Sequence, residues 1–332
     1  MDKNQELLDF EESLIENNYT LSNLEFESGK VLKDLNVQYT TIGKAIKNDN
    51  GEIVNAIVYF HGSSGNYASI RRLYQIIGEK KVLDTNKYFI ISVSTLGAPG
   101  STSPSNSALK NKFPKYTILD MVNFQKKFLK EKFNIKKLKG IIGNSMGGFE
   151  TLTWACEYPD DMDFIISIVS SHKVAGHNYS IFKIENKIIE NDPEYNNGDY
   201  SKPIKSTGIA NASTHPFGFS FKFYRYHQSN NDIDLAIEEM ITEGNEIDAN
   251  DTIFKNNACL NYDLTDKLVN IKAKTLLISI TEDLYFPPEL DAVETNELIK
   301  DSKLIVYDSL LGHVGSNEIL KIENDLKEFL SD

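Results

Sequence analysis

A serine between glycines, directly after a short apolar run, is the feature that most restricts how this chain folds. The segment Gly-Asn-Ser-Met-Gly-Gly begins at Gly143 and follows Gly-Ile-Ile. The pattern predicts a sharp turn from a strand into a helix, because Gly143 and Gly147 lack the side chains that would keep the two elements apart. Such a turn holds Ser145 clear of the sheet and points the Met146 amide along a helix N-terminus, where negative charge is favoured. Ser145 is therefore a candidate nucleophile.

The composition of the chain argues against several classes of protein. The chain has 332 residues, 40% of them hydrophobic, and a formal net charge of -13. The acidic balance argues against a nucleic-acid surface, and no apolar run approaches the ~18 residues of a membrane span. We expect a cytoplasmic protein without membrane or nucleic-acid partners. Two cysteines, Cys156 and Cys259, are too few for a disulfide framework and are expected to be buried thiols.

Short apolar runs alternate with helical patterns along most of the chain. This alternation predicts an α/β fold with a mostly parallel sheet and helices on both faces. A capping-box pattern, Thr117-x-x-Asp120, predicts the start of one helix, and apolar spacing over 319–330 predicts another. The expected strands are 36–42, 53–60, 88–93, 138–142, 164–169, 275–280 and 303–307.

One long stretch, 171–268, breaks this alternation. It is rich in Asn, Asp, Tyr and Phe, and it lacks the short apolar strands found elsewhere. We expect 1–170 and 269–332 to form the core and 171–268 to be a helical lid insertion over the carboxyl ends of the strands, where ligands bind in open α/β folds. A packing extension that never touches a ligand is the alternative.

A serine nucleophile needs a base, and the base needs an acid that fixes its tautomer. Asp283 follows the apolar run 275–280, and His313 follows the next run, which ends at 307. Both lie where strand ends are expected, in the order Ser, Asp, His. Glu282 is a rival acid, but neighbouring side chains point in different directions, so at most one reaches His313. The remaining histidines lie in the insertion, at its edge, or in the motif described next.

A pair of amides is also required to stabilise an oxyanion. The segment His-Gly-Ser-Ser-Gly begins at His61, directly after an expected strand. We expect the Ser63 N–H to act with the Met146 N–H, and Gly62 to be the alternative donor. An ordinary glycine-rich turn is the other interpretation of this segment.

Several motifs spread over most of the chain occur together. Besides the serine motif and Trp154-Ala155, they are Leu96-Gly97, 100–105, 113–122, Asp192-Pro193, 198–200, 283–287 and Gly312-His313. In these motifs the chain resembles the homoserine O-acetyltransferase family and its esterase relatives within the α/β-hydrolase superfamily. The resemblance implies an α/β-hydrolase fold and assigns the family's nucleophile, acid and base to Ser145, Asp283 and His313. It also implies a homodimer formed through the insertion.

Two departures from the acetyltransferase pattern stand out. The family carries an arginine shortly after a Gly-Leu dipeptide, whereas 208–213 here reads Gly-Ile-Ala-Asn-Ala-Ser, and an aspartate usually follows the histidine where this chain has Val314. Parts of the insertion, including the segment Phe-Tyr-Arg that ends at Arg225, resemble the hydrolytic branch instead. We expect Gly62, Tyr224 and Arg225 to contact the substrate, with Arg225 replacing the missing arginine from another direction.

These observations favour a serine enzyme that forms an acyl intermediate at Ser145. The first expectation is a carboxylic-ester hydrolase acting on short acyl esters, without a cofactor and without a metal. The second is an O-acetyltransferase that uses acetyl-CoA as co-substrate and homoserine or a related hydroxy amino acid as acceptor. A third is a binding protein that retains only the fold, although the complete set of candidate residues argues against it.

Overall fold

The computed structural model describes residues 3–331 and contains one large, mostly parallel sheet. Its inner strands pair in parallel, whereas β1 and β2 add an antiparallel hairpin at one edge. The α/β prediction with a mostly parallel sheet is therefore confirmed. In spatial order the strands are β1 (Asn17–Glu25), β2 (Val31–Ile42), β6 (Phe89–Val93), β3 (Ala56–Phe60), β7 (Leu138–Asn144), β8 (Met162–Ile168), β9 (Lys274–Ile280) and β10 (Ser302–Tyr307).

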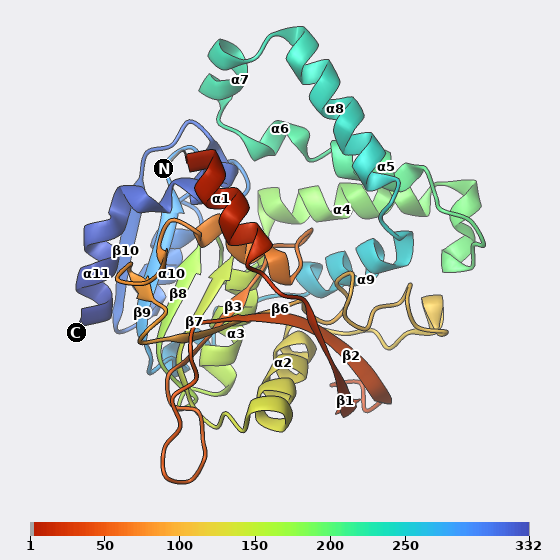
Figure 1. Cartoon of the computed structure of the whole chain (residues 1–332). Coiled ribbons are helices and arrows are strands. Elements are labelled where there is room, and N and C mark those ends of the chain that lie inside the picture. Colours follow the sequence, from red (N-terminus) through yellow and green to blue (C-terminus); the bar gives the residue numbers. More distant parts are fainter. Residues whose placement is uncertain (1–2, 332) are drawn as a thin grey trace.

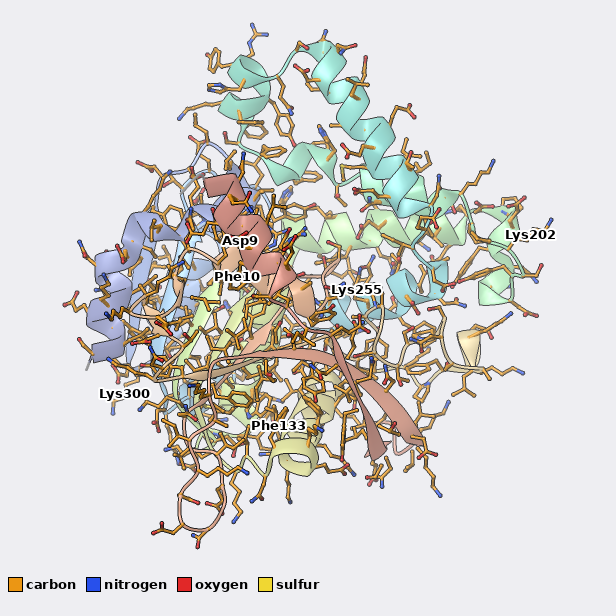
Figure 2. The ribbon with its side chains drawn as sticks, in the orientation of Figure 1. Asp9, Phe10, Phe133, Lys202, Lys255 and Lys300 are labelled. Atoms are coloured by element: carbon orange, nitrogen blue, oxygen red, sulfur yellow. The ribbon has the colours of Figure 1, made fainter. Side chains whose placement is uncertain are left out.

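Helices cover both faces of this sheet (Figure 1). Successive residues of β3 point to opposite faces, so Val58 and Phe60 belong to one hydrophobic core and Ile57 and Tyr59 to another. The first core includes α2 (Ile118–Phe133) and α3 (Met146–Glu157), and the second includes α11 (Glu323–Ser331). Figure 2 shows side chains filling the space between these layers.

The predicted start of α2 is confirmed. The Thr117 side chain accepts a hydrogen bond from the Asp120 N–H, and the Asp120 carboxylate accepts one from the Thr117 N–H at 3.0 Å. These two bonds satisfy amides that a helix start leaves without intrahelical partners. The helix ends at Asn134, which adopts the left-handed conformation with φ 54°.

A run of helices separates β8 from β9. These helices lie above and to the right of the sheet in Figure 1, where α7 and α8 extend farthest from the core. The two ends of the run are held side by side: the Leu264 N–H donates to the His172 carbonyl at 2.9 Å and the Val174 N–H to the Tyr262 carbonyl at 3.0 Å. The helices are α4 (Gly176–Glu190), η3 (Pro193–Gly198), α5 (Ser206–Ala212), α6 (His215–Gly218), α7 (Phe221–His227), α8 (Asn230–Gly244) and α9 (Ala249–Leu260).

The sequence missed several smaller elements and misplaced several strand boundaries, of which the start of β2, at Val31 rather than at 36, differs most. Strand β3 begins at Ala56 rather than at 53, because the Asn55 side chain donates to the carbonyls of Lys44 and Lys87 and Ile53 makes only an isolated bridge. No helix in the described part of the chain has the length and apolar character needed to cross a bilayer. The unpredicted elements are α1 (Lys3–Glu12), β1, η1 (Tyr67–Leu73), β4 (Ile77–Gly78), β5 (Leu83–Asp84), η2 (Lys110–Lys112), η4 (Leu268–Asn270), α10 (Ala292–Leu298) and η5 (Gly312–Ile322).

Candidate active site

Ser145 lies at the junction of β7 and α3 with φ 56° and ψ -120°, a conformation that is strained for a residue with a side chain. Its N–H donates to the Ile168 carbonyl of the neighbouring strand at 2.9 Å. A Cβ on Gly143 would overlap the backbone of Gly147, and a Cβ on Gly147 would overlap the Phe60 carbonyl. Both glycines are therefore required for the close approach of strand and helix that the sequence predicted.

The structure brings Ser145, His313 and Asp283 into one chain of hydrogen bonds. The Ser145 hydroxyl lies 3.0 Å from His313 Nε2, and His313 Nδ1 lies 2.8 Å from Asp283 Oδ2. The three residues follow β7, β9 and β10, whose carboxyl ends share one edge of the sheet. With the Nδ1 proton donated to the carboxylate, Nε2 is left as the acceptor for the serine hydroxyl.

The Asp283 carboxylate is fully enclosed and fixed in position. Its side chain is 0% exposed, and Oδ1 accepts hydrogen bonds from the backbone N–H groups of Tyr285 at 2.8 Å and Phe286 at 3.0 Å. The rings of Tyr285 and Phe286 also pack against His313, with centroids 4.7 and 5.7 Å away. The neighbouring Glu282 points elsewhere and pairs with Lys222 of α7 at 2.6 Å.

The loop after β3 approaches Ser145 from the other side. A Cβ built on Gly62 would lie 3.5 Å from the Ser145 Cβ, so the Gly62 backbone is next to the serine. The Gly62 carbonyl accepts hydrogen bonds from His61 Nδ1 at 2.7 Å and from the Gly65 N–H at 2.9 Å. The N–H of Ser63 belongs to the same planar trans peptide as this carbonyl and therefore points the opposite way.

Met146 offers a second amide beside the serine. It is the first residue of α3, so its N–H has no carbonyl one turn earlier in the helix with which to bond. The aligned peptides of the helix add positive potential at this end. The amides of Met146 and Ser63 are thus the two candidates for binding a negatively charged oxygen.

The contacts of Tyr224 and Arg225 do not connect either residue with Ser145. The Tyr224 hydroxyl donates to the His215 carbonyl within the insertion, and Arg225 is exposed on α7. Arg225 makes no hydrogen bond or ion pair with any residue in 3–331. The His177 ring lies nearer to the acid loop, because its Nε2 donates to the Leu284 carbonyl at 2.8 Å.

Three polar residues behind the site were not identified from sequence. Thr95, Gln125 and Glu150 form a buried cluster beneath His61. The available signal was Glu150 itself, an acidic residue among the otherwise apolar or small residues that follow Met146. Its neighbours come from other segments of the chain, so their proximity depends on the fold.

The cysteine prediction is confirmed, since both Cys156 and Cys259 are buried free thiols. Burial raises the pKa of each to about 12, which leaves the thiols protonated. Within residues 3–331, no group of three or more His, Cys, Asp or Glu side chains is arranged to hold a metal ion.

The fold and the geometry at the strand ends define an α/β hydrolase. Residues 55–310 match the family model described as alpha/beta hydrolase fold, and the chain belongs to this family. It is an enzyme of the branch that includes the homoserine O-acetyltransferases and related esterases, as the resemblance implied.

Relatives of both kinds are similar over nearly the whole chain. A probable acyltransferase of Methanothermobacter thermautotrophicus is 42% identical over 94% of this chain and 96% of its own length. A homoserine O-acetyltransferase of Methanococcus vannielii is 31% identical over 95% of this chain and 72% of its own length. The solved structure of an acetylester hydrolase from Corynebacterium glutamicum is 27% identical, with a TM-score of 0.84 and 100% of both chains covered.

Proposed function

We propose that this protein is a serine esterase that hydrolyses short acyl esters. The observation that carries the proposal is the continuous hydrogen-bonded set of Ser145, His313 and Asp283, with donor–acceptor distances of 3.0 and 2.8 Å. A histidine oriented by a buried carboxylate is the arrangement that activates a serine hydroxyl. The acetylester hydrolase structure supports the same class of reaction.

In the proposed mechanism, His313 removes the Ser145 proton as Oγ attacks the acyl carbonyl. The carbonyl electrons move to oxygen, and the Met146 and Ser63 amides stabilise that oxyanion. His313 then donates its proton to the departing alcohol as the ester C–O bond breaks, which leaves an acyl-enzyme. Water, deprotonated by His313, releases the carboxylic acid and restores the serine.

Three features support hydrolysis over transfer to an amino acid. The segment 208–213 contains no arginine, Val314 follows His313, and Arg225 is exposed on α7. A guanidinium that forms two hydrogen bonds with a carboxylate typically contributes about 1.5–3 kcal/mol of binding free energy. The absence of such an arginine weakens the binding of an amino-acid acceptor. Gly62 retains a proposed role beside the ester, whereas the contacts of Tyr224 support a role within the insertion.

The remaining properties are proposals of the same kind. The reaction needs no cofactor or metal, since all its groups are side chains and amides of this chain. We expect a cytoplasmic enzyme acting on a small-molecule ester, with neither nucleic acid nor membrane as partner. The insertion acts as a lid and pairs two copies, a proposal supported by apolar side chains on α7 and α8: Phe221 is 70% exposed, Tyr226 76% and Leu235 62%.

A transferase that uses acetyl-CoA as co-substrate is the second candidate, and one lysine favours it. Lys255 of α9 is partly buried, yet it makes no hydrogen bond or ion pair with any described residue. Figure 2 labels it beside α9. Burial lowers the pKa of His61, beside the Gly62 loop, to about 4 and raises that of Glu185 on α4 to about 7, and the charge of Lys255 makes a smaller contribution to both. A half-buried ammonium in this position suits the carboxylate of an acceptor.

Two assays separate these functions. Hydrolysis of p-nitrophenyl acetate should proceed steadily and disappear in Ser145→Ala; turnover that persists in this variant contradicts a serine mechanism. Free thiol is then measured after acetyl-CoA is added with and without homoserine. A rapid release that depends on homoserine would make the protein an acetyltransferase rather than an esterase.

A further inference from the structure

Glu150 is a buried acid in the helix that begins at the candidate nucleophile. Its side chain is 0% exposed, and Oε2 accepts hydrogen bonds from Gln125 Nε2 at 2.6 Å and from the Thr95 hydroxyl at 2.9 Å. Gln125 Nε2 also lies 3.0 Å from the Thr95 hydroxyl. The other carboxyl oxygen, Oε1, has no partner among residues 3–331, and neither has the Gln125 carbonyl oxygen.

The surroundings of Glu150 favour its neutral form. No lysine, arginine or histidine in the described chain forms an ion pair with it, and burial raises the pKa of the carboxyl to about 8. The other titratable groups that face it are the Tyr116 phenol and the Cys259 thiol on α9. Burial raises the pKa of both, that of Cys259 to about 12, so both groups stay neutral. Neither can balance a negative charge on Glu150. The positive charge of Lys255 contributes to the pKa of Cys259 and to that of His61.

Thr95 connects this acid with the loop beside Ser145. While its hydroxyl bonds to Glu150, its backbone N–H donates to His61 Nε2 at 3.1 Å. Nε2 is thereby an acceptor, so the single proton of a neutral imidazole lies on Nδ1. Burial lowers the pKa of His61 to about 4, which keeps the ring neutral. The tautomer of His61 is therefore set by two backbone groups, the Thr95 N–H and the Gly62 carbonyl, and the Thr95 side chain links the first of them to Glu150.

The last bond in the chain fixes a peptide plane. His61 Nδ1 donates to the Gly62 carbonyl at 2.7 Å, which turns the N–H of the same peptide, that of Ser63, away from His61. A rotation of this plane would move the Ser63 N–H away from any oxyanion. A donor of this kind typically contributes 10²–10³-fold in kcat, provided that its direction is already correct when charge develops.

We propose that Glu150, held in its protonated form, is a positioning residue that orients the Ser63 N–H for the oxyanion through Thr95, His61 and the Gly62 carbonyl. The proposal rests on the proposed esterase function. It assigns a role to a carboxyl group that touches neither substrate nor reacting atoms. It also makes the enzyme sensitive to alkaline pH, since ionisation places an unpaired charge at one end of the chain of bonds.

The pH profile of Glu150→Gln tests this role. The protonated fraction of a group with a pKa near 8 falls about tenfold between pH 7 and 9. In the wild type, kcat for p-nitrophenyl acetate should fall by the same factor over this range, while KM stays constant. Glutamine stays neutral, so the variant should keep its kcat across this range. Glu157→Gln, at the far end of the same helix where the carboxylate pairs with Lys267, is the matched control and should retain the wild-type fall. A fall that persists in Glu150→Gln overturns the proposal.

Substitutions at Thr95 test the same role while Glu150 is retained. Thr95→Val removes the hydroxyl and should lower kcat several-fold at pH 7 with little change in KM, whereas Thr95→Ser should restore it. Equal activity of the valine and serine variants would contradict the relay. Ser145→Ala is assayed beside both: turnover independent of Ser145 rejects the esterase function itself, whereas Ser145-dependent turnover with an unchanged pH profile rejects only the relay.

Thermal unfolding separates positioning from stability. Glu150 has a folded-state pKa above the ordinary value of 4.5, so its contribution to stability is complete below pH 4.5 and declines as pH rises towards 8. The difference in Tm between Glu150→Gln and the wild type should therefore increase in favour of the variant from pH 4.5 to pH 8. Above pH 8 this difference should stay constant. A purely structural role predicts this gain in Tm without the change in kcat.

Discussion

The strand ends that carry Ser145, Asp283 and His313 differ from the helical insertion above them in how firmly their side chains are held. Both oxygens of Asp283 are hydrogen-bonded in a fully buried setting, and the backbone of Ser145 is fixed by glycines that tolerate no side chain. Helix α7, by contrast, buries none of its side chains, and α8 buries only Gly244. In the proposed function, the firmly held core carries out the chemistry and the loosely packed insertion selects the molecules that reach it.

The largest effect is expected in the core, at the acid of the proposed triad. Asp283→Asn can no longer fix the histidine tautomer and should lower kcat about 10⁴-fold on p-nitrophenyl acetate. Glu282→Gln, one residue earlier, loses only an ion pair with Lys222 and should stay within about twofold. A large loss in Glu282→Gln with activity retained in Asp283→Asn would reassign the acid.

Two glycine substitutions compare backbone tolerance in the two regions. In Gly147→Ala, the new methyl group overlaps the Phe60 carbonyl, and we expect a loss of about 3 kcal/mol in the free energy of unfolding. In Gly218→Ala, within α6 of the insertion, the nearest atom is the Tyr224 hydroxyl at 3.8 Å, and the change should be within about 0.5 kcal/mol. Denaturant unfolding measures both. Similar losses would remove the contrast between the regions.

A change within the insertion should alter selectivity rather than the chemical step. If Lys255 binds a carboxylate, Lys255→Met should raise KM about tenfold for an ester with a carboxylate on its alcohol, and leave KM for its uncharged analogue unchanged. Lys255→Arg retains the charge and serves as the control. An equal rise for both esters would mean that the substitution disturbs packing instead of removing an anion-binding group.

The smallest effect on activity is expected at the tip of the insertion. Phe221→Ser combined with Tyr226→Ser removes two exposed apolar side chains and should leave kcat on p-nitrophenyl acetate within about twofold. If these side chains join two copies, the double variant should sediment as a monomer where the wild type sediments as a dimer. A wild type that is monomeric at all concentrations would reject the proposed dimer.

The sequence predicted the central strands and the proximity of Ser145, Asp283 and His313, for a shared physical reason. Strands such as β9 are buried on both faces, so they read as continuous apolar runs, and parallel strands place their carboxyl ends at one edge. Chain order then sufficed to bring His313 to Ser145. Strand β1 was missed because only two of its nine side chains are buried and its residues are largely polar.

The parts that sequence did not predict depend on contacts between distant segments. Thr95, Gln125 and Glu150 come from a loop and two helices, and a glutamate in a helix ordinarily faces water. The contacts of Tyr224 and Arg225 depend on the path of the insertion, which no periodic pattern constrains. Residues set by strand register were therefore predictable, whereas those set by loop and helix packing were not.

The two ends of the insertion lie side by side, which makes the segment easy to replace. Because backbone hydrogen bonds join His172 to Leu264 and Val174 to Tyr262, the chain leaves the core and returns to it at one point. A segment whose ends already lie together is replaced or lengthened at little entropic cost. Replacement of the segment at this junction should therefore leave Ser145, Asp283 and His313 in place at the strand ends.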